Sequence, residues 1–292
     1  MHPTPSIIIF TTLSGLGFGL LFWLGIGMPP VTGWEAFAYY FAAFALAAGG
    51  LVSSTFHLGR PERALKAFTQ WSTSWLSREG ICAVAALLVF GINAAGAVFW
   101  NVRVPVLGYI GSVLALGTVF ATSMIYAQLN TVPLWKTHLT PVLFLLASIA
   151  GGALLGAHAL ISAMLLPVAA LVQAIWWMRG DRIRNEMETT IETATGLGNA
   201  GKVRSFEPPH TGANYLLREF AFEVGRKNAR RLRMIALTLA YTLPFFAIIL
   251  APDHWNVLAV PTAVVHLAGV AVARWLFFAE AVHVVGHYYG RR

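Results

Sequence analysis

The residues best suited to chemistry lie in a polar stretch between two long apolar runs, from His57 to Glu79. This stretch holds four basic residues, two acidic residues, one histidine and two tryptophans, although only 11% of the chain is charged. Ionisable groups at the ends of membrane helices are costly unless they are paired, hydrated or functional. A loop whose basic residues only set the topology is the alternative interpretation.

Two residues of this stretch are candidates for moving protons. His57 has an ordinary pKa near ~6.5, so its ring can donate a hydrogen bond and be reprotonated at physiological pH. Glu79 stands at the start of the next apolar run, where burial and the neighbouring Arg60 and Arg78 act on its carboxyl group in opposite senses. Whether its pKa is raised or lowered, Glu79 is a candidate proton carrier.

Aromatic and basic residues surround these two groups. Trp71 and Trp75 offer flat faces for an aromatic ligand at the level of the lipid headgroups, and the ordinary belt of interfacial aromatic residues is the alternative. Arg60 and Arg63 could hold a ligand anion, a lipid headgroup or an acidic partner protein, and topology alone would also account for them.

A second set of ionisable residues lies at the C-terminal end of the chain. Arg274 falls inside the last apolar run, where an unpaired arginine costs about 2.5 to 3.5 kcal/mol by insertion scales. Glu280 and His283 are expected on the same helix, toward its cytoplasmic end, as part of a proton path. A structural ion pair between Arg274 and another span is the alternative.

Composition predicts an all-α, polytopic transmembrane bundle in a single domain over 1–292. The chain is 57% hydrophobic, with a mean hydropathy of +0.67, and its apolar runs are unbroken over helix length rather than alternating as in a barrel. One cysteine, Cys82, excludes an iron-sulfur cluster held by this chain alone. The net charge of +8 lies in loops beside apolar runs, which favours lipid and topology over nucleic acid.

The apolar runs predict about eight spans. The run from Pro141 to Met178 is too long for one helix, so we divide it near 156–159; the first run is taken as a retained span rather than a signal peptide. The predicted spans are Ile7–Met28, Ala36–Phe56, Ile81–Trp100, Val106–Ala127, Pro141–Gly156, Leu160–Met178, Met234–Ala251 and Ala259–Glu280.

Eight spans put both termini and the loops 57–80, 128–140 and 179–233 on one side. That side carries eighteen of the twenty Lys and Arg residues, whereas the opposite side has Arg103. The positive-inside rule makes the crowded side cytoplasmic. We therefore expect a bacterial inner-membrane protein whose polar stretch and basic loop face the cytoplasm.

The long loop is expected to contain two helical segments. The first is Asp181–Thr195, and turns are expected at 196–201 and 208–209. The segment Asn214–Arg233 has the pattern of a basic amphipathic helix, which binds either anionic lipid or an acidic partner protein.

Short motifs along the chain resemble those of one known family. The N-terminal ones are His57-Leu58-Gly59, Arg63-Ala64, Ser74-x-x-Ser77-x-Glu79, Tyr126, Asn130-Thr131-Val132-Pro133-x-Trp135 and Thr140-Pro141. Their order and separation over the first five spans resemble the DmsC family, the membrane anchor subunits of DMSO reductase-type molybdoenzymes. The last span matches less well, through Arg274 and Phe277-Phe278.

The resemblance implies an eight-span subunit without haem. It would exchange electrons between a membrane quinone, ubiquinone or menaquinone, and an iron-sulfur subunit that serves a molybdopterin catalytic subunit. In that family the His-Leu-Gly histidine and the following glutamate belong to the quinol site, a role carried here to His57 and Glu79. The candidate quinone-binding or proton-transfer residues are His57, Arg60, Arg63, Trp71, Trp75, Arg78, Glu79, Tyr126, Arg274, Glu280 and His283.

Further motifs are similar to those of anchors of cytoplasmic sulfite-oxidising complexes. They lie at 193–198, 208–211 and 214–216. The cytoplasmic basic face agrees with this interpretation, whereas the DMSO reductase anchors are thought to dock their partners on the opposite side of the membrane. An anchor that oxidises quinol for such a reductase stays open as an alternative.

Three other functions compete with a haem-free redox anchor. A haem b protein would use histidines such as His158 and His266, or His283 and His287. A small transporter would need a midplane site and internal repeats, and no convincing repeat is present. A purely structural tether would leave His57 and Glu79 dispensable.

Overall fold

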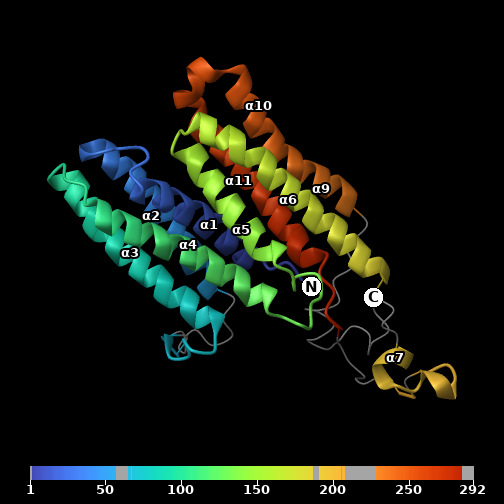
Figure 1. Cartoon of the computed structure of the whole chain (residues 1–292). Coiled ribbons are helices and arrows are strands. Elements are labelled where there is room, and N and C mark those ends of the chain that lie inside the picture. The colour runs from blue at the N-terminus through green and yellow to red at the C-terminus, as the bar shows by residue number, and fades with distance from the viewer. Residues whose placement is uncertain are drawn as a thin grey trace.

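The computed structural model describes residues 2–56, 65–66, 68–186, 191–204, 206–207 and 228–284, and it shows a bundle of long helices (Figure 1). The described residues contain no strand, which confirms the all-α prediction. The six long helices of the first two thirds are α1 Pro5–Gly25, α2 Gly33–Thr55, α3 Trp75–Phe99, α4 Pro105–Ala127, α5 Leu139–Leu155 and α6 Ala159–Glu186. The remaining elements are α7 Ile191–Thr195, η2 Gly198–Ala200, α9 Ala229–Leu237, η3 Thr238–Thr242, α10 Leu243–Leu250, η4 Pro252–His254 and α11 Trp255–Ala279.

Each predicted span overlaps an apolar helix. Seven helical segments in the described residues are long and apolar enough to cross a membrane, and α5 is a shorter apolar helix of 17 residues. The elements α9, η3 and α10 together form one of the seven, over 229–250. The expected division of the run after Pro141 is also correct, because α5 ends at Leu155 and α6 begins at Ala159.

Helix α1 lies in the middle of the bundle, where it packs against α2, α4, α5 and α11. Glycines allow the close approach: a Cβ at Gly17 would meet the backbone of Ala47, and one at Gly19 would meet the backbone of Ser148. Small residues at such positions let membrane helices touch through their backbones. Close packing against α1 therefore orients the neighbouring helices.

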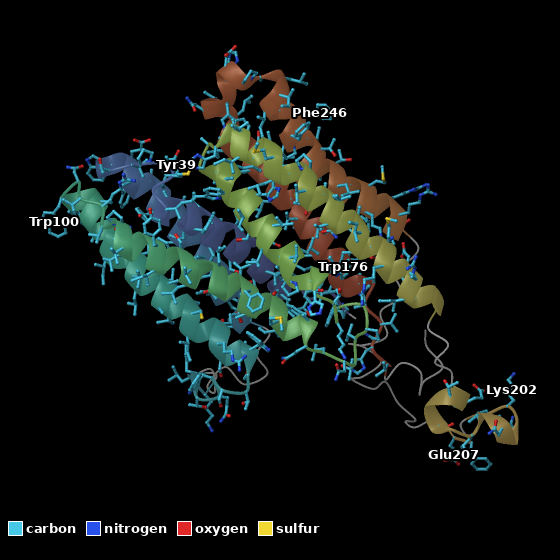
Figure 2. The ribbon with its side chains drawn as sticks, in the orientation of Figure 1. Tyr39, Trp100, Trp176, Lys202, Glu207 and Phe246 are labelled. Carbon is cyan, nitrogen blue, oxygen red and sulfur yellow. The ribbon has the colours of Figure 1, made fainter. Side chains whose placement is uncertain are left out.

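Successive spans alternate in direction, so α1 begins and α11 ends at the same end of the bundle (Figure 1). We call this end, where Ala127 and Leu139 also lie, the basic end, because exposed Lys136, Arg182, Arg230 and Arg231 border it. Tryptophans occur both inside and outside the bundle: Trp176 is buried, whereas Trp100 is exposed at the other end (Figure 2).

The third span starts earlier than predicted. Helix α3 begins at Trp75 rather than Ile81, so Glu79 lies within the helix. Arg78 stabilises this start by donating hydrogen bonds to the carbonyl oxygens of Trp71 and Ser72, at 2.9 and 2.7 Å. The prediction was late because it followed the apolar run, whereas the first turn of the helix contains both polar and apolar residues.

The long loop is described in part. The helix expected over Asp181–Thr195 is present as the end of α6 and as α7, and 187–190 between them lie outside the described residues. Most of the expected amphipathic helix, 214–227, also lies outside them, and α9 begins shortly afterwards at Ala229.

Candidate functional site

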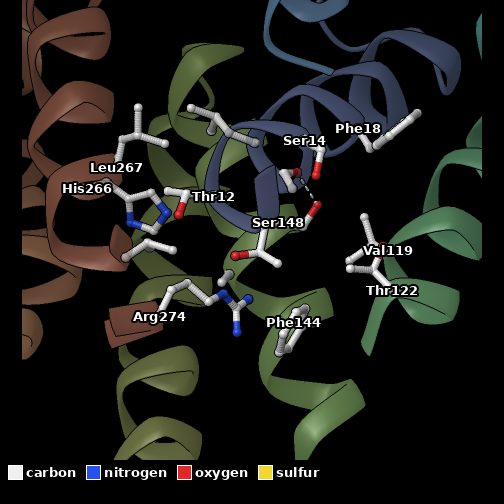
Figure 3. Close-up of a pocket in the computed structure, with 15 residues that line it drawn as sticks. Thr12, Ser14, Phe18, Val119, Thr122, Phe144, Ser148, His266, Leu267 and Arg274 are labelled. Atoms are coloured by element: carbon white, nitrogen blue, oxygen red, sulfur yellow. Dashed lines mark hydrogen bonds between the residues drawn. The ribbon is translucent and has the colours of Figure 1, made fainter. Parts of the chain in front are cut away.

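A narrow pocket lies between α1, α4, α5 and α11, within the apolar part of the bundle (Figure 3). The space that protein atoms leave unfilled there, including the part open to the outside, is about 420 Å³. The residues that line it are Thr11, Thr12, Ser14, Gly15, Leu16, Phe18, Val119, Thr122, Phe144, Ala147, Ser148, His266, Leu267, Val270 and Arg274.

Arg274 enters this pocket from α11, and its side chain is buried with 4% exposed (Figure 3). The guanidinium carbon lies 3.3 Å from the ring centroid of Phe144, a cation–π contact. Among the described residues no carboxylate pairs with Arg274, and its Nε has no hydrogen-bond partner. The structural ion pair considered as the alternative is therefore not found in the described part of the chain, and a buried cation remains uncompensated.

Glu79 lies behind the opposite wall of the pocket. Its buried carboxylate is hydrogen-bonded to the hydroxyl of Thr122 on α4, which also lies 3.0 Å from the carbonyl oxygen of Thr118. A threonine hydroxyl has one proton but can also accept. An ionised Glu79 can thus accept from Thr122, and a protonated Glu79 can donate to Thr122 while Thr122 donates to Thr118. The geometry serves both protonation states, as a proton carrier requires.

Tyr126 lies one turn after Thr122 on α4, within electrostatic range of both charged groups. The charges of Glu79 and Arg274 both act on its hydroxyl group. The Tyr126 ring packs against four aromatic rings with centroids 5.3 to 6.0 Å away, those of Trp135, Phe144, Phe277 and Phe278. Tyr126 therefore interacts with both the Glu79 carboxyl group and the Arg274 guanidinium.

Three candidate residues from three helices thus meet near one end of the bundle. Glu79 is four residues inside α3 and Arg274 is five residues before the end of α11, which places both about 6 to 8 Å from the basic end. Thr122 and Phe144, which complete the site, were missed from sequence. The i, i+4 spacing of Thr122 and Tyr126 within an apolar run was the available signal.

The other candidates of the polar stretch are not in the pocket. Trp71 is 65% exposed, and Trp75 packs edge-on against Phe120 at 5.7 Å. The guanidinium of Arg78 lies over the Trp75 ring at 4.3 Å and is engaged in starting α3. Residues 57–64, with the candidates His57, Arg60 and Arg63, lie outside the described residues.

Glu280 belongs to a separate ionic cluster that joins α6, α9 and α11. Arg233 donates to Glu280 Oε1 at 3.0 Å and to both carboxylate oxygens of Asp181 at 2.6 and 2.8 Å. Burial raises the pKa of Glu280 above its ordinary value, and Arg233 opposes that shift. This cluster closes the basic end on a different side of the bundle from Thr122 and Glu79.

The expectation that the last helix continues to His283 was wrong, whereas Glu280 caps this helix and its amide donates to the Leu276 carbonyl oxygen at 2.9 Å. Helix α11 ends at Ala279, and the following segment is held by a bond from the Val284 amide to the Thr131 carbonyl oxygen at 3.0 Å. Burial lowers the pKa of His283 below its ordinary value. His283 therefore lies against the loop between α4 and α5, beyond the membrane-length helix.

Loss of Arg233 should destabilise the basic end. The Arg233→Ala variant would leave Glu280 buried without its cation, so we expect the free energy of unfolding to fall by about 2 kcal/mol, less than a fully buried pair because Asp181 is half-exposed. Thermal unfolding in detergent measures this effect. Arg231→Ala on the exposed side of α9 is the control, and equal stability of the two variants would contradict a stabilising cluster.

Two of the three described histidines considered as haem ligands, His266 and His158, are each held by local structure. His266 Nδ1 lies 2.6 Å from the carbonyl oxygen of Ala240, in the π-helical turn η3. His158 lies at the turn between α5 and α6, and its ring centroid is 5.5 Å from that of Trp23. Residues 285–292, including His287, lie outside the described residues.

Comparison with known proteins identifies the family. The family model described as "DMSO reductase anchor subunit (DmsC)" matches residues 1–279. The chain belongs to the DmsC family. The DmsC-family protein is therefore a multi-pass membrane anchor of an oxidoreductase complex, in agreement with the resemblance of its motifs.

Curated relatives carry two kinds of name. A protein of Allochromatium vinosum named as a subunit of sulfite dehydrogenase is 31% identical over 99% of both sequences. A protein of Escherichia coli named as part of anaerobic dimethyl sulfoxide reductase is also 31% identical, over 41% of this sequence and 42% of its own. The E. coli protein YnfH, named in the same way, is 31% identical over 53% of this sequence and 57% of its own. No solved structure matches the DmsC-family protein.

Proposed function

We propose that this anchor subunit is quinone-reactive and passes electrons between an iron-sulfur subunit and the quinone pool of a molybdoenzyme complex. The observation that carries the proposal is the buried Arg274 on one wall of a membrane pocket, with no carboxylate partner in the described part of the chain, and the Thr122–Glu79 pair on the other wall. A buried cation and a buried proton carrier beside an apolar pocket suit a neutral ring that becomes negative and then takes up protons.

Quinone reduction requires different groups on the two sides of the pocket. The reaction adds two electrons and two protons, and negative charge develops on the ring oxygens before protonation. The guanidinium of Arg274 can donate to one ring oxygen and stabilise that charge. Glu79, through the Thr122 hydroxyl, can exchange a proton with the other side of the ring. Oxidation of a quinol runs through the same groups in reverse.

The positions of the exposed basic residues support a complex docked on the cytoplasmic side. The Glu79–Arg274 site lies near the basic end, where exposed Lys136, Arg230 and Arg231 suit an acidic partner surface or anionic lipid. An iron-sulfur subunit docked at this end would be close to the site. In a bacterial inner membrane, this end would face the cytoplasm.

Sulfite oxidation is the proposed reaction of the whole complex. The relative named for sulfite dehydrogenase aligns over nearly the full length of both sequences, whereas those named for dimethyl sulfoxide reductase align over less than 60%. Electrons would then leave the molybdopterin subunit, pass through the iron-sulfur subunit and reduce the quinone. A complex that oxidises quinol is the alternative, and substrate assays with both couples separate the two.

The test is electron transfer by the complete complex in membranes. His57→Ala, which removes the histidine of the His-Leu-Gly motif, should reduce quinone-linked transfer at least about a hundredfold, the lower end of what a general acid–base group contributes. Activity with an artificial acceptor and retention of the partner subunits should be unchanged. Wild-type quinone-linked transfer in this variant would exclude His57 from the site.

A further inference from the structure

The pocket beside Arg274 also borders the outer edge of the bundle, along the seam between α1 and α11. Gly15 is partly exposed although it belongs to the central helix, and a Cβ added there would meet no atom of the described residues within 4 Å. Across the seam Leu267 is partly exposed, and Val264, one turn earlier on α11, is 60% exposed. The pocket therefore has an open side at Gly15 and Leu267 that faces the lipid.

One stripe of α11 connects this open side to the charged end of the pocket. Leu267, Val270 and Arg274 recur at i, i+3 and i+7, which places them on one face of the helix. Seven residues span about 10 Å along the axis, so the opening lies two turns deeper in the membrane than Arg274. A flat ring that entered at Leu267 would therefore reach the guanidinium by following this face of α11.

The hydroxyl groups of the pocket are already used by the protein. Thr12 donates to the Ile8 carbonyl oxygen at 2.5 Å, Ser14 to that of Phe10 at 2.6 Å, and Ser148 to that of Gly15 at 2.5 Å. Among the described lining residues Arg274 retains an unpartnered donor. The wall near the opening is therefore compatible with an apolar chain, and unsatisfied polarity lies at the inner end.

We infer that an isoprenoid quinone enters sideways from the bilayer between α1 and α11, with Gly15 and Leu267 forming the two sides of the entrance. The inference rests on the proposed function and adds the route and the position of the tail. The ring oxygen binds at Arg274, and the apolar tail leaves through the seam into the lipid. A polar route through the loops would instead expose this apolar tail to water, which is unfavourable in proportion to the apolar surface exposed.

The test narrows the entrance from one side and uses a matched control. Gly15→Leu adds a side chain in the opening, and Gly49→Leu adds the same side chain to an exposed helical glycine of α2 that also has no atom within 4 Å. We expect Gly15→Leu to raise KM for long-tailed ubiquinone in liposomes about tenfold and to slow its binding in stopped-flow measurements. Ubiquinone with a single isoprene unit should be affected much less, and Gly49→Leu should match the wild type.

Leu267→Phe narrows the same entrance from the side of α11. It provides the same test if Gly15→Leu does not fold. Partner retention and artificial-acceptor activity report folding in each variant. Wild-type kinetics of long-tailed ubiquinone in folded Gly15→Leu and Leu267→Phe would overturn the entrance, while loss of quinone-linked transfer in Arg274→Gln would still support the quinone site. Wild-type transfer in Arg274→Gln as well would overturn the proposed function itself.

Discussion

Arg274→Gln should reduce quinone-linked electron transfer by the assembled complex at least about a hundredfold, the scale seen when one donor to a developing oxyanion is removed. Glutamine keeps a hydrogen-bond donor near the pocket but lacks the positive charge that faces the ring. Arg274→Lys should recover part of the activity, because lysine keeps the charge without the planar guanidinium. Steady-state transfer to ubiquinone, compared with an artificial acceptor that bypasses the site, measures the effect.

The melting temperature of the variant distinguishes a quinone-binding role of Arg274 from a structural role. The guanidinium is buried without a carboxylate partner in the described residues, so its removal should leave the melting temperature unchanged or raise it. An arginine that mainly holds helices together would instead lower the melting temperature when lost. Arg103→Gln, at the exposed opposite end of the bundle, is the control for a general effect of charge removal. A destabilised Arg274→Gln with normal quinone transfer would refute the binding role.

Glu79→Gln should lower kcat for quinone-linked transfer at least about a hundredfold while KM changes little. Glutamine can keep a hydrogen bond to Thr122 but cannot carry a proton, so the variant isolates proton transfer from packing. In single-turnover experiments, the variant should slow the proton-coupled step without changing reduction of the iron-sulfur subunit.

Variants of Thr122 provide the matched control for Glu79. Thr122→Ser keeps the hydroxyl and should retain most activity, whereas Thr122→Val removes it and should lie between the wild type and Glu79→Gln. If Glu79→Gln keeps wild-type kcat and Thr122→Val loses activity, the hydroxyl rather than the carboxyl group serves the ring. If both keep wild-type kcat, the proton reaches the quinone by another route.

The sequence alone was sufficient for the architecture, because the constraints involved are local. Apolar run length and Gly156 determined where the spans lie and divided the run after Pro141 correctly. Helix starts were less predictable: the beginning of α3 depends on bonds from Arg78 to the carbonyl oxygens of Trp71 and Ser72, and hydropathy does not record such bonds.

The sequence also marked Glu79 and Arg274 as unusual, since polar groups in apolar runs are costly wherever they point. Tyr126 became a candidate only through the resemblance of its motif to the family. Only the tertiary structure decided that these three meet and that Glu280 pairs elsewhere with Arg233. The physical reason is that the rotation of each helix about its axis is set by packing against its neighbours, through small residues such as Gly17 and Gly19. Whether a buried charge meets a partner depends on that rotation. In the described residues, the guanidinium of Arg274 faces a pocket rather than a carboxylate.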